Sequence, residues 1–247
     1  MINTLSEQDI LSIWEFGLRQ HPVERALTVL AVADPSLSRA HLLASSVGQR
    51  DMALLAIREQ VFGASFASYA ECPQCRAALE FAFSAIDIRV GAAPETNDGQ
   101  VLTFECDGYI IHARLPDSAD QLAIVSCGNV ASARALLLQR CILSVANQDA
   151  AIGVDELPES VIAALGEAVV ERDPQAEIRL KLVCPSCDNH WFAVFDILAF
   201  LWREITTHAR RILRDVNVLA SAYGWSESEI LALSAMRRRF YLEMVAE

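Results

Sequence analysis

The sequence predicts an α+β protein in which helical regions at both ends enclose strand-forming segments. Apolar residues recur every three or four positions over the first sixty residues, alternate with period two in the middle, and return to the helical period after Asp196. A chain of 247 residues with 53% hydrophobic and 21% charged residues can bury a substantial core, which excludes disorder over its whole length. We therefore expect a globular α+β fold.

Residues 1–63 are expected to form an N-terminal helical subdomain. Ser6 begins a capping-box sequence ahead of a first amphipathic helix, which ends before Pro22. Pro22 in turn suits the first turn of a second helix. A third helix is predicted over residues 51–62, because Gly63 stands where a left-handed C-terminal cap belongs.

Residues 64–90 and 176–196 are expected to be the two halves of a zinc ribbon. Each half shows the period-two alternation of half-buried strands on both sides of a short turn sequence. These turn sequences are Cys72-Pro73-Gln74-Cys75 and Cys184-Pro185-Ser186-Cys187.

Residues 91–175 separate the two ribbon halves and are expected to form an αβ insertion. Its first ten residues, 91–100, are polar and contain Gly, Pro, Asn and Asp, which is typical of an exposed connection. Asp107-Gly108 is a strong hairpin-turn sequence between two predicted strands. The expected strands and helices of the insertion cover residues 101–105, 109–114, 130–145 and 158–171.

Residues 197–247 are expected to form a C-terminal helical region. Asp196 can cap a long helix whose apolar residues lie along one stripe as far as Tyr223, and Gly224 closes it. Such a helix is about 39 Å long, which exceeds the needs of a small domain, so it either spans the fold or projects to a partner. Two shorter helices are predicted after it, beginning at Ser226 and Ser234.

The two Cys-Pro-x-Cys turns have the spacing of zinc knuckles. Cysteines three positions apart can direct both thiolates at one ion from a tight turn, and two such turns supply the four sulfurs of a closed tetrahedral site. The predicted ligands are Cys72, Cys75, Cys184 and Cys187, and the predicted ion is Zn. Four cysteines leave no open coordination position, so the site is expected to be structural and not catalytic.

The long separation between the two pairs does not exclude this site. Cys75 and Cys184 are 109 positions apart, which is far more than the usual ribbon spacing. Closing such a loop costs on the order of 4 kcal/mol, because the cost grows only with the logarithm of its length. Zinc binding contributes roughly 10 to 16 kcal/mol, so the metal outweighs the closure cost.

Other interpretations of the cysteines and of His190 were weighed against zinc. Redox dithiols usually occur once, at the start of a helix after a strand, whereas here two pairs precede strand-like segments. Inert thiols are the remaining alternative. Cys106, Cys127 and Cys141 are expected to be buried as small apolar side chains. His190 is expected to be a solvent-facing turn residue, and the alternatives are that it donates to a knuckle sulfur or replaces a ligand.

Composition and missing motifs exclude several classes of protein. Lys181 is the single lysine and follows Leu180, so a phosphate-binding Gly-Lys-Ser/Thr loop is absent. The chain carries no zinc-protease, serine-hydrolase, dinucleotide or deaminase signature, so no enzymatic activity is expected. No apolar run is long enough to span a membrane, and the first ten residues lack the pattern of a secretory signal. We therefore expect a cytoplasmic protein with reduced cysteines.

Nucleic-acid binding is the alternative function that the sequence leaves open. The formal charge of −12 and the pI near 4.9 are opposite to those of proteins that coat phosphate backbones. A zinc-ribbon regulator would need positive potential beside the ribbon, where Arg76, Arg179 and Lys181 are opposed by nearby acidic residues. The arginines at 210, 211, 214 and 237–239 favour a solvated helix face or a contact with an acidic protein surface. The four tryptophans, Trp14, Trp191, Trp202 and Trp225, are expected to pack in cores.

Several short motifs together resemble the baseplate hub assembly proteins of contractile-tailed phages and phage-tail-like injection systems. The N-terminal motifs are Asp51, Leu54, Leu55, Arg58, Phe62-Gly63, Cys72-Pro-x-Cys and Ile86-Asp87-Ile88. The C-terminal motifs are Arg114-Leu115-Pro116, Cys184-Pro-x-Cys, Trp191, Phe195-Asp196-Ile197, Tyr223-Gly224-Trp225-Ser226 and Arg237-Arg238.

This resemblance implies a non-enzymatic role in assembly. The protein would be a chaperone or minor component that helps baseplate and tail proteins come together, and it could be part of the assembled particle. Its expected partners are other baseplate or tail proteins. The long amphipathic C-terminal helix suits such docking, although a stripe of this kind also suits a core.

Overall fold

The computed structural model describes residues 4–90, 101–148 and 150–246, and it confirms the α+β fold class. The polar connection expected over residues 91–100 lies outside the described residues. The chain divides into two compact units. One unit combines Met1–Pro35 with Leu198–Glu247, the other is Ser36–Ile197, and each is described by itself.

The first unit is helical. Its elements are α1 (Glu7–Gly17), α2 (Pro22–Ala33), α10 (Glu227–Leu231), α11 (Ala235–Ala246) and, except for its first residue, α9 (Ile197–Tyr223). Ser6 and Asp9 form the predicted capping box of α1, and Pro22 occupies the first position of α2. Ser226 caps α10 in the same way, so the predicted starts of these helices are confirmed.

Trp202 on α9 lies where α1, α2 and α9 meet. The guanidinium of Arg25 lies 4.3 Å from the centre of the Trp202 ring, and its Nε donates to the carbonyl of Gly17. A Cβ atom at Gly17 would lie 2.3 Å from the same ring, so only glycine permits this approach. The sequence places small and aromatic residues where α1, α2 and α9 meet.

The C-terminal helices are held by an ion pair and by aromatic contacts. Arg238 is buried and pairs with Glu7, so for this arginine the expectation of a solvated face or a contact with another protein was wrong. Tyr223 stacks on Trp225 at a centroid distance of 4.7 Å, and Tyr241 lies edge-on to Trp225 at 4.9 Å. The turn after α9, closed by Gly224 with positive φ as predicted, is thereby fixed against α11.

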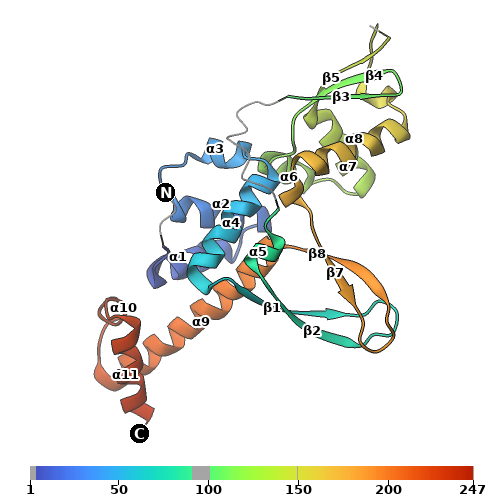
Figure 1. Ribbon diagram of the computed structural model, residues 1–247. Coiled ribbons are helices and arrows are strands. Elements are labelled where there is room, and N and C mark those ends of the chain that lie inside the picture. The colour runs from blue at the N-terminus through green and yellow to red at the C-terminus, as the bar shows by residue number, and fades with distance from the viewer. Residues whose placement is uncertain (1–3, 91–100, 149, 247) are drawn as a thin grey trace. The chain divides into compact units, whose positions relative to one another are not determined.

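The second unit contains several helices around a sheet and two hairpins (Figure 1). Its α-helices are α3 (Arg39–Ala44), α4 (Val47–Phe62), α5 (Ala85–Ile88), α6 (Ser118–Ile124), α7 (Val130–Cys141) and α8 (Glu159–Arg172). Two 3-10 turns, η1 (Val154–Glu156) and η2 (Pro174–Ala176), flank α8. The backbone N–H of Gly48 on α4 donates to the buried Asp173 carboxylate over 2.9 Å, which ties α4 to the end of α8.

The segment expected to be an insertion contains a four-stranded antiparallel sheet in the order β3-β4-β5-β6. Its strands are β3 (Leu102–Cys106), β4 (Tyr109–Ala113), β5 (Ile142–Asn147) and β6 (Ala150–Ala151). Asp107 and Gly108 both have positive φ, as the two-residue turn between β3 and β4 requires. Ile111 and Val145 face each other across β4 and β5 and form a buried core with Val161 and Leu165 of α8.

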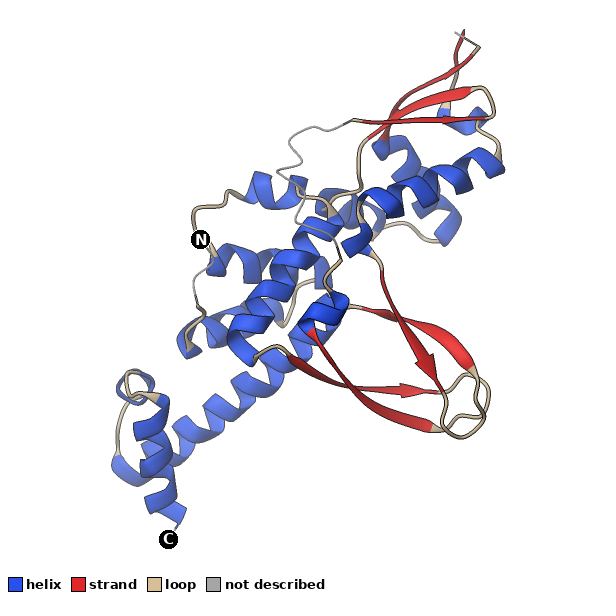
Figure 2. Cartoon of the chain, viewed as in Figure 1, coloured by secondary structure: helices blue, strands red, loops and turns tan. Residues whose placement is uncertain are grey.

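Two separate two-stranded hairpins cover the segments expected to be the ribbon halves. The first pairs β1 (Ser65–Glu71) with β2 (Ala78–Ser84), and the second pairs β7 (Ile178–Val183) with β8 (His190–Phe195). The four strands match the predicted strand-forming segments. Figure 2 shows the turns of the two hairpins meeting, although a long stretch of chain separates them in sequence.

Some predicted boundaries were wrong. The helix expected over residues 130–145 ends at Cys141, because Ile142 and Val145 pair with β4 and bury their side chains as a strand. The third helix begins at Val47, earlier than expected, with a capping box from Ser46. Gly63 has positive φ, but its ψ of 174° is extended and not left-handed helical. Sequence reasoning also missed α3, α5, α6, β5 and β6.

Candidate metal centre

The first knuckle is a tight turn between β1 and β2. The N–H of Cys72 donates to the carbonyl of Ala77 over 2.9 Å, and the N–H of Arg76 donates to the carbonyl of Cys72 over 3.0 Å. Arg76 has a φ of 63°, which non-glycine residues adopt infrequently. The backbone bonds therefore close the turn and place both cysteine side chains on the same side of it.

The second knuckle repeats this geometry between β7 and β8. The N–H of Cys184 donates to the carbonyl of Asn189 over 2.9 Å, and the N–H of Asp188 donates to the carbonyl of Cys184 over 3.0 Å. Asp188, which corresponds in position to Arg76, has a φ of 54°. Two segments of different sequence thus adopt the same turn around the same Cys-Pro-x-Cys spacing.

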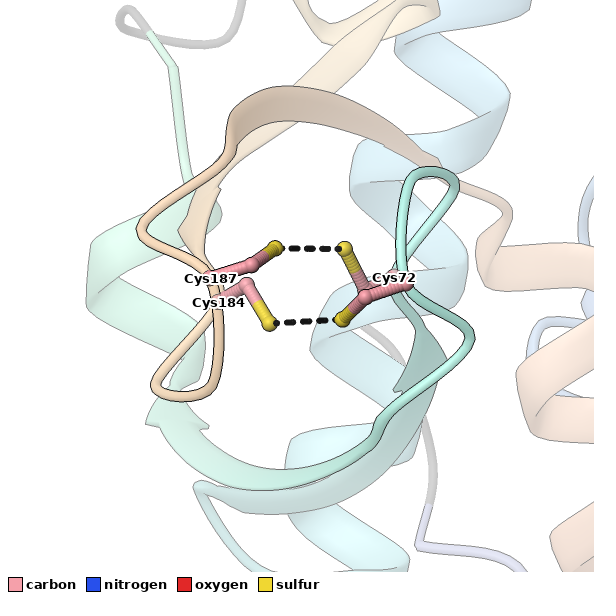
Figure 3. Close-up of side chains that lie close together, drawn as sticks. Cys72, Cys184 and Cys187 are labelled. Atoms are coloured by element: carbon pink, nitrogen blue, oxygen red, sulfur yellow. Dashed lines mark hydrogen bonds between the residues drawn. The ribbon is translucent and has the colours of Figure 1, made fainter.

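The four cysteine sulfurs converge between the two turns. The Sγ atoms of Cys72 and Cys187 are 3.7 Å apart, and those of Cys75 and Cys184 are 3.5 Å apart (Figure 3). All four Sγ atoms lie within 4.8 Å of one another. These separations are far longer than the disulfide bond of about 2.05 Å. Within the described residues, no other group of three or more His, Cys, Asp or Glu side chains has ligand atoms that meet in this way.

The burial of the cluster differs between the first and the second cysteine of each knuckle. Cys72 and Cys184 are completely buried, Cys187 is half-buried and Cys75 is exposed. The N–H of Ser186 donates to the Cys184 sulfur over 3.4 Å. The second cysteine of each turn is therefore more accessible to solvent than the first.

The surroundings of the cysteines favour ionisation of one thiol and oppose ionisation of a second. Burial opposes ionisation of Cys72, but backbone N–H groups of Cys75 and Gln74 and the neighbouring thiols lower its pKa to about 6. An Asn189 N–H lowers the pKa of Cys187, yet the Cys75 sulfur, burial and the other sulfurs together raise it to about 12. Several thiolates at this distance repel one another, and a divalent cation between them would remove that repulsion.

The arrangement fits a tetrahedral metal ion. Zinc–sulfur bonds of about 2.3 Å at tetrahedral angles place the sulfurs about 3.8 Å apart. The separations of the two cross-knuckle pairs, 3.5 and 3.7 Å, are close to this value. The cluster could hold one metal ion with four thiolate ligands and without an open position for a substrate.

An aromatic cluster joins the two hairpins at the end opposite the cysteines. Phe66 of β1 stacks on Phe83 of β2 at 4.9 Å, and both contact Phe195 of β8 edge-on at 5.6 and 5.4 Å. The buried guanidinium of Arg58 lies 3.7 Å from the centre of the Phe66 ring. Sequence reasoning did not identify this cluster, although each of the three rings lies on the inward-facing register of its strand.

The other residues considered from the sequence lie apart from the cysteine cluster. Cys141 is buried as expected, but Cys106 and Cys127 are only half-buried, and His190 is exposed at the start of β8. All four tryptophans are half-buried. These positions add no ligand to the candidate centre.

A buried ionic network that sequence reasoning missed lies beside the insertion sheet. Asp120 is completely buried and accepts two hydrogen bonds from Arg114, at 2.6 and 2.8 Å, and one from Arg140 at 2.6 Å. Burial opposes ionisation, but the bonds from Arg114 outweigh it and hold the pKa of Asp120 below its usual range. The shared carboxylate thus links the end of β4 to α6 and α7.

The fold and the site together define a helical α+β protein with two hairpins joined by a four-cysteine cluster that could hold a metal ion. None of the helices in the described ranges combines the length and the apolar run that a bilayer crossing requires. A family model described as T4 bacteriophage base plate protein matches residues 35–202. The chain belongs to this family of phage baseplate proteins. Comparison with curated proteins and with solved structures found no match.

Proposed function

We propose that the protein is a non-enzymatic assembly factor or minor structural component of the baseplate of a contractile phage tail or related injection system. In this proposal Cys72, Cys75, Cys184 and Cys187 hold a structural zinc ion. The observation that carries it is the convergence of four sulfurs from two distant knuckles, inside the region that matches the baseplate family.

Zinc is the metal that the ligand set favours. Four thiolates in tetrahedral arrangement are typical of structural zinc, which needs no redox change and no open position. Iron–sulfur centres use the same four ligands, so metal analysis must distinguish the two. Bound zinc would supply positive charge that holds four thiolates together and would fix the two hairpin turns to each other.

The proposal divides the chain by the role of each segment. Residues 64–90 and 176–196 form the ribbon, and residues 91–175 are an insertion whose ends the metal would hold together. Residues 1–63 and 197–247 provide helices, and we infer that the C-terminal region presents a docking surface to other baseplate proteins. The amphipathic α9 and the exposed apolar residues of α11, Met236, Phe240 and Met244, support this inference.

The charges around the ribbon argue against the nucleic-acid alternative. Arg76 pairs with Glu71 at 2.8 Å, and Arg179 pairs with Glu177 at 2.7 Å. Lys181 is exposed on β7 opposite Phe192, and it is one cation in a chain of net charge −12. A surface with this balance gives little attraction to a phosphate backbone.

The experiment that tests the proposal measures metal content and particle assembly together. Purified protein should contain about one zinc per chain by elemental analysis, and the double variant Cys72→Ser/Cys184→Ser should contain none. The same variant, supplied to a strain that lacks the gene, should fail to support assembly of tail particles. Cys127→Ser is the matched control, because Cys127 lies outside the cluster.

Two results would count against the proposal. If wild-type protein purified under reducing and metal-replete conditions contained no bound metal, the proposed structural zinc site would be wrong. The proposed role in assembly would be wrong if particle yield were normal with the double cysteine variant, or in the strain that lacks the gene.

A further inference from the structure

Four arginines form a stripe on the exposed face of α9. Arg203, Arg210, Arg211 and Arg214 are all exposed, and we call them the arginine stripe. With 3.6 residues per turn, Arg203, Arg210 and Arg214 fall within about 40° of one another around the helix axis, and Arg211 lies about 60° from Arg214. The stripe extends for about 16 Å along the helix.

The stripe lies on the side of α9 opposite its apolar face. Six apolar residues of the helix between positions 201 and 219 are almost completely buried, and their mean direction is about 180° from the arginines. These buried residues are Leu201, Ile205, Ala209, Ile212, Val216 and Leu219. The arginines therefore do not contribute to the core that α9 forms.

The arginines of the stripe have no carboxylate partners in the described part of the chain. Arg203 lies over the ring of Phe200, Arg211 contacts the imidazole of His208 at 3.2 Å, and Arg214 donates to the carbonyl of Arg210 over 3.3 Å. Exposed arginines elsewhere, such as Arg134 with Glu159, do form ion pairs. The absence of such pairs is notable in a chain with 32 acidic and 20 basic residues.

Solvation alone does not explain why these exposed positions of α9 carry like charges. Like charges three or four positions apart destabilise a helix by a few tenths of a kcal/mol per pair, and opposite charges stabilise it by as much. Burial, and then the Arg211 charge, lower the pKa of His208, while the charges of Glu7 and Asp215 raise it in part. Four exposed guanidinium groups without carboxylate partners among the described residues thus lie along one side of a helix in an acidic protein.

We propose that the arginine stripe is a docking surface for an acidic protein surface on another baseplate component. The inference rests on the proposed function and names the kind of partner. Four guanidinium groups over about 16 Å match carboxylates spaced along about three turns of a helix. A duplex of nucleic acid fits less well, because it presents phosphates well beyond the stripe to a chain of net charge −12.

The test reverses two charges of the stripe and compares the variant with a matched control. Arg210→Glu/Arg214→Glu changes the stripe, and Arg19→Glu/Lys181→Glu makes the same change in net charge at exposed positions outside it. Both variants should keep the wild-type circular dichroism and zinc content. In a strain lacking the gene, the stripe variant should lower particle yield at least tenfold, and the control should stay within about twofold of wild type.

Suppressor selection then identifies the chemistry of the partner. Starting from the stripe variant, restored yield should come from acidic-to-basic substitutions in another tail or baseplate protein. Arg210→Lys/Arg214→Lys should retain most of the yield, since it keeps the charge. Equal yields for the stripe and control variants would overturn the proposal.

A second experiment tests whether the partner of the stripe is a nucleic acid and not a protein. Wild-type protein is titrated with a 20-base-pair DNA duplex at low salt, and no complex is expected at micromolar protein. Micromolar binding that the stripe variant loses would overturn the proposal in favour of a nucleic-acid site. If the double cysteine variant blocks assembly while the stripe variant does not, the docking inference fails and the proposed function stands.

Discussion

The sulfurs of Cys75 and Cys184 lie 3.5 Å apart although the two residues are separated by 109 positions in the chain. A second cross-knuckle pair, Cys72 and Cys187, lies beside them. The hairpins therefore meet at both ends, through sulfur at the turns and through Phe66, Phe83 and Phe195 at the base. These two joints can be tested independently.

Removal of one proposed ligand should destabilise the second unit strongly. Cys72→Ser leaves three thiolates, and we expect the zinc content to fall well below one per chain and the melting temperature to fall by more than 10 °C. Elemental analysis and thermal denaturation by circular dichroism measure the two effects. Cys106→Ser should change neither, and equal metal content in Cys72→Ser would show that this sulfur is not a ligand.

Loss of the aromatic joint should destabilise the protein without removing the metal site. Phe66→Ala removes a completely buried ring that contacts Phe83, Phe195 and Arg58, so we expect a cost of about 3–5 kcal/mol in urea denaturation. Metal content should stay near wild type. Phe192→Ala, at a ring that is 64% exposed, should cost less than about 1 kcal/mol. Similar costs for the two substitutions would contradict the packing described.

The buried carboxylate of Asp120 should contribute far more to the free energy of unfolding than an exposed carboxylate does. Asp120→Asn leaves Arg140 without its anion and Arg114 with Asp117 alone, and we expect a loss of about 3 kcal/mol at pH 7. Glu159→Gln breaks the exposed pair with Arg134 and should cost less than about 1 kcal/mol. Urea denaturation of both variants compares them directly, and a small effect at Asp120 would contradict the network.

Asp51 should make the protein less stable as the pH rises from 4 to 6. Burial raises the pKa of Asp51 to about 6, Arg50 lowers it in part, and the nearby Asp196 and Asp173 raise it further. A folded pKa above the unfolded value means that the folded state binds the proton more tightly. The stabilisation that this proton gives is complete below pH 4 and is lost as the pH rises through 6.

Comparison with Asp51→Asn isolates this effect from other titrating groups. Urea denaturation between pH 4 and 7 should show a wild-type free energy of unfolding that falls, relative to the variant, by on the order of 3 kcal/mol. Above pH 7 the difference should be constant. Parallel pH profiles for the two proteins would show that Asp51 does not titrate in this range.

Much of the fold followed from local sequence signals. Capping residues such as Ser6 and Ser226, and the turn at Asp107-Gly108, specify their elements by short-range hydrogen bonds and allowed φ angles, so the sequence alone predicts them. The four strands of the two cysteine hairpins were predicted from another local signal, the period-two alternation of apolar residues. The convergence of the cysteines was predicted because thiol pairs with equal spacing suggest one ion.

The missed features depend on contacts between distant residues. The segment after Cys141 continues a helical apolar pattern, and it becomes β5 because Ile142 and Val145 are buried against β4. Asp120, Arg114 and Arg140 come together only after α6 and α7 have folded beside β4. The short helices α3 and α6 lack the repeated apolar period that reveals longer ones.

The position of Lys181 gives experimental access to the ribbon. It is the single lysine of the sequence, and it is exposed on β7 next to Phe192. An amine-reactive fluorophore or cross-linker therefore has one side-chain target, close to the turns that the metal would hold. Attached there, the fluorophore would report opening of the hairpins on chelation, and the cross-linker would capture whichever neighbour approaches this strand in an assembled particle.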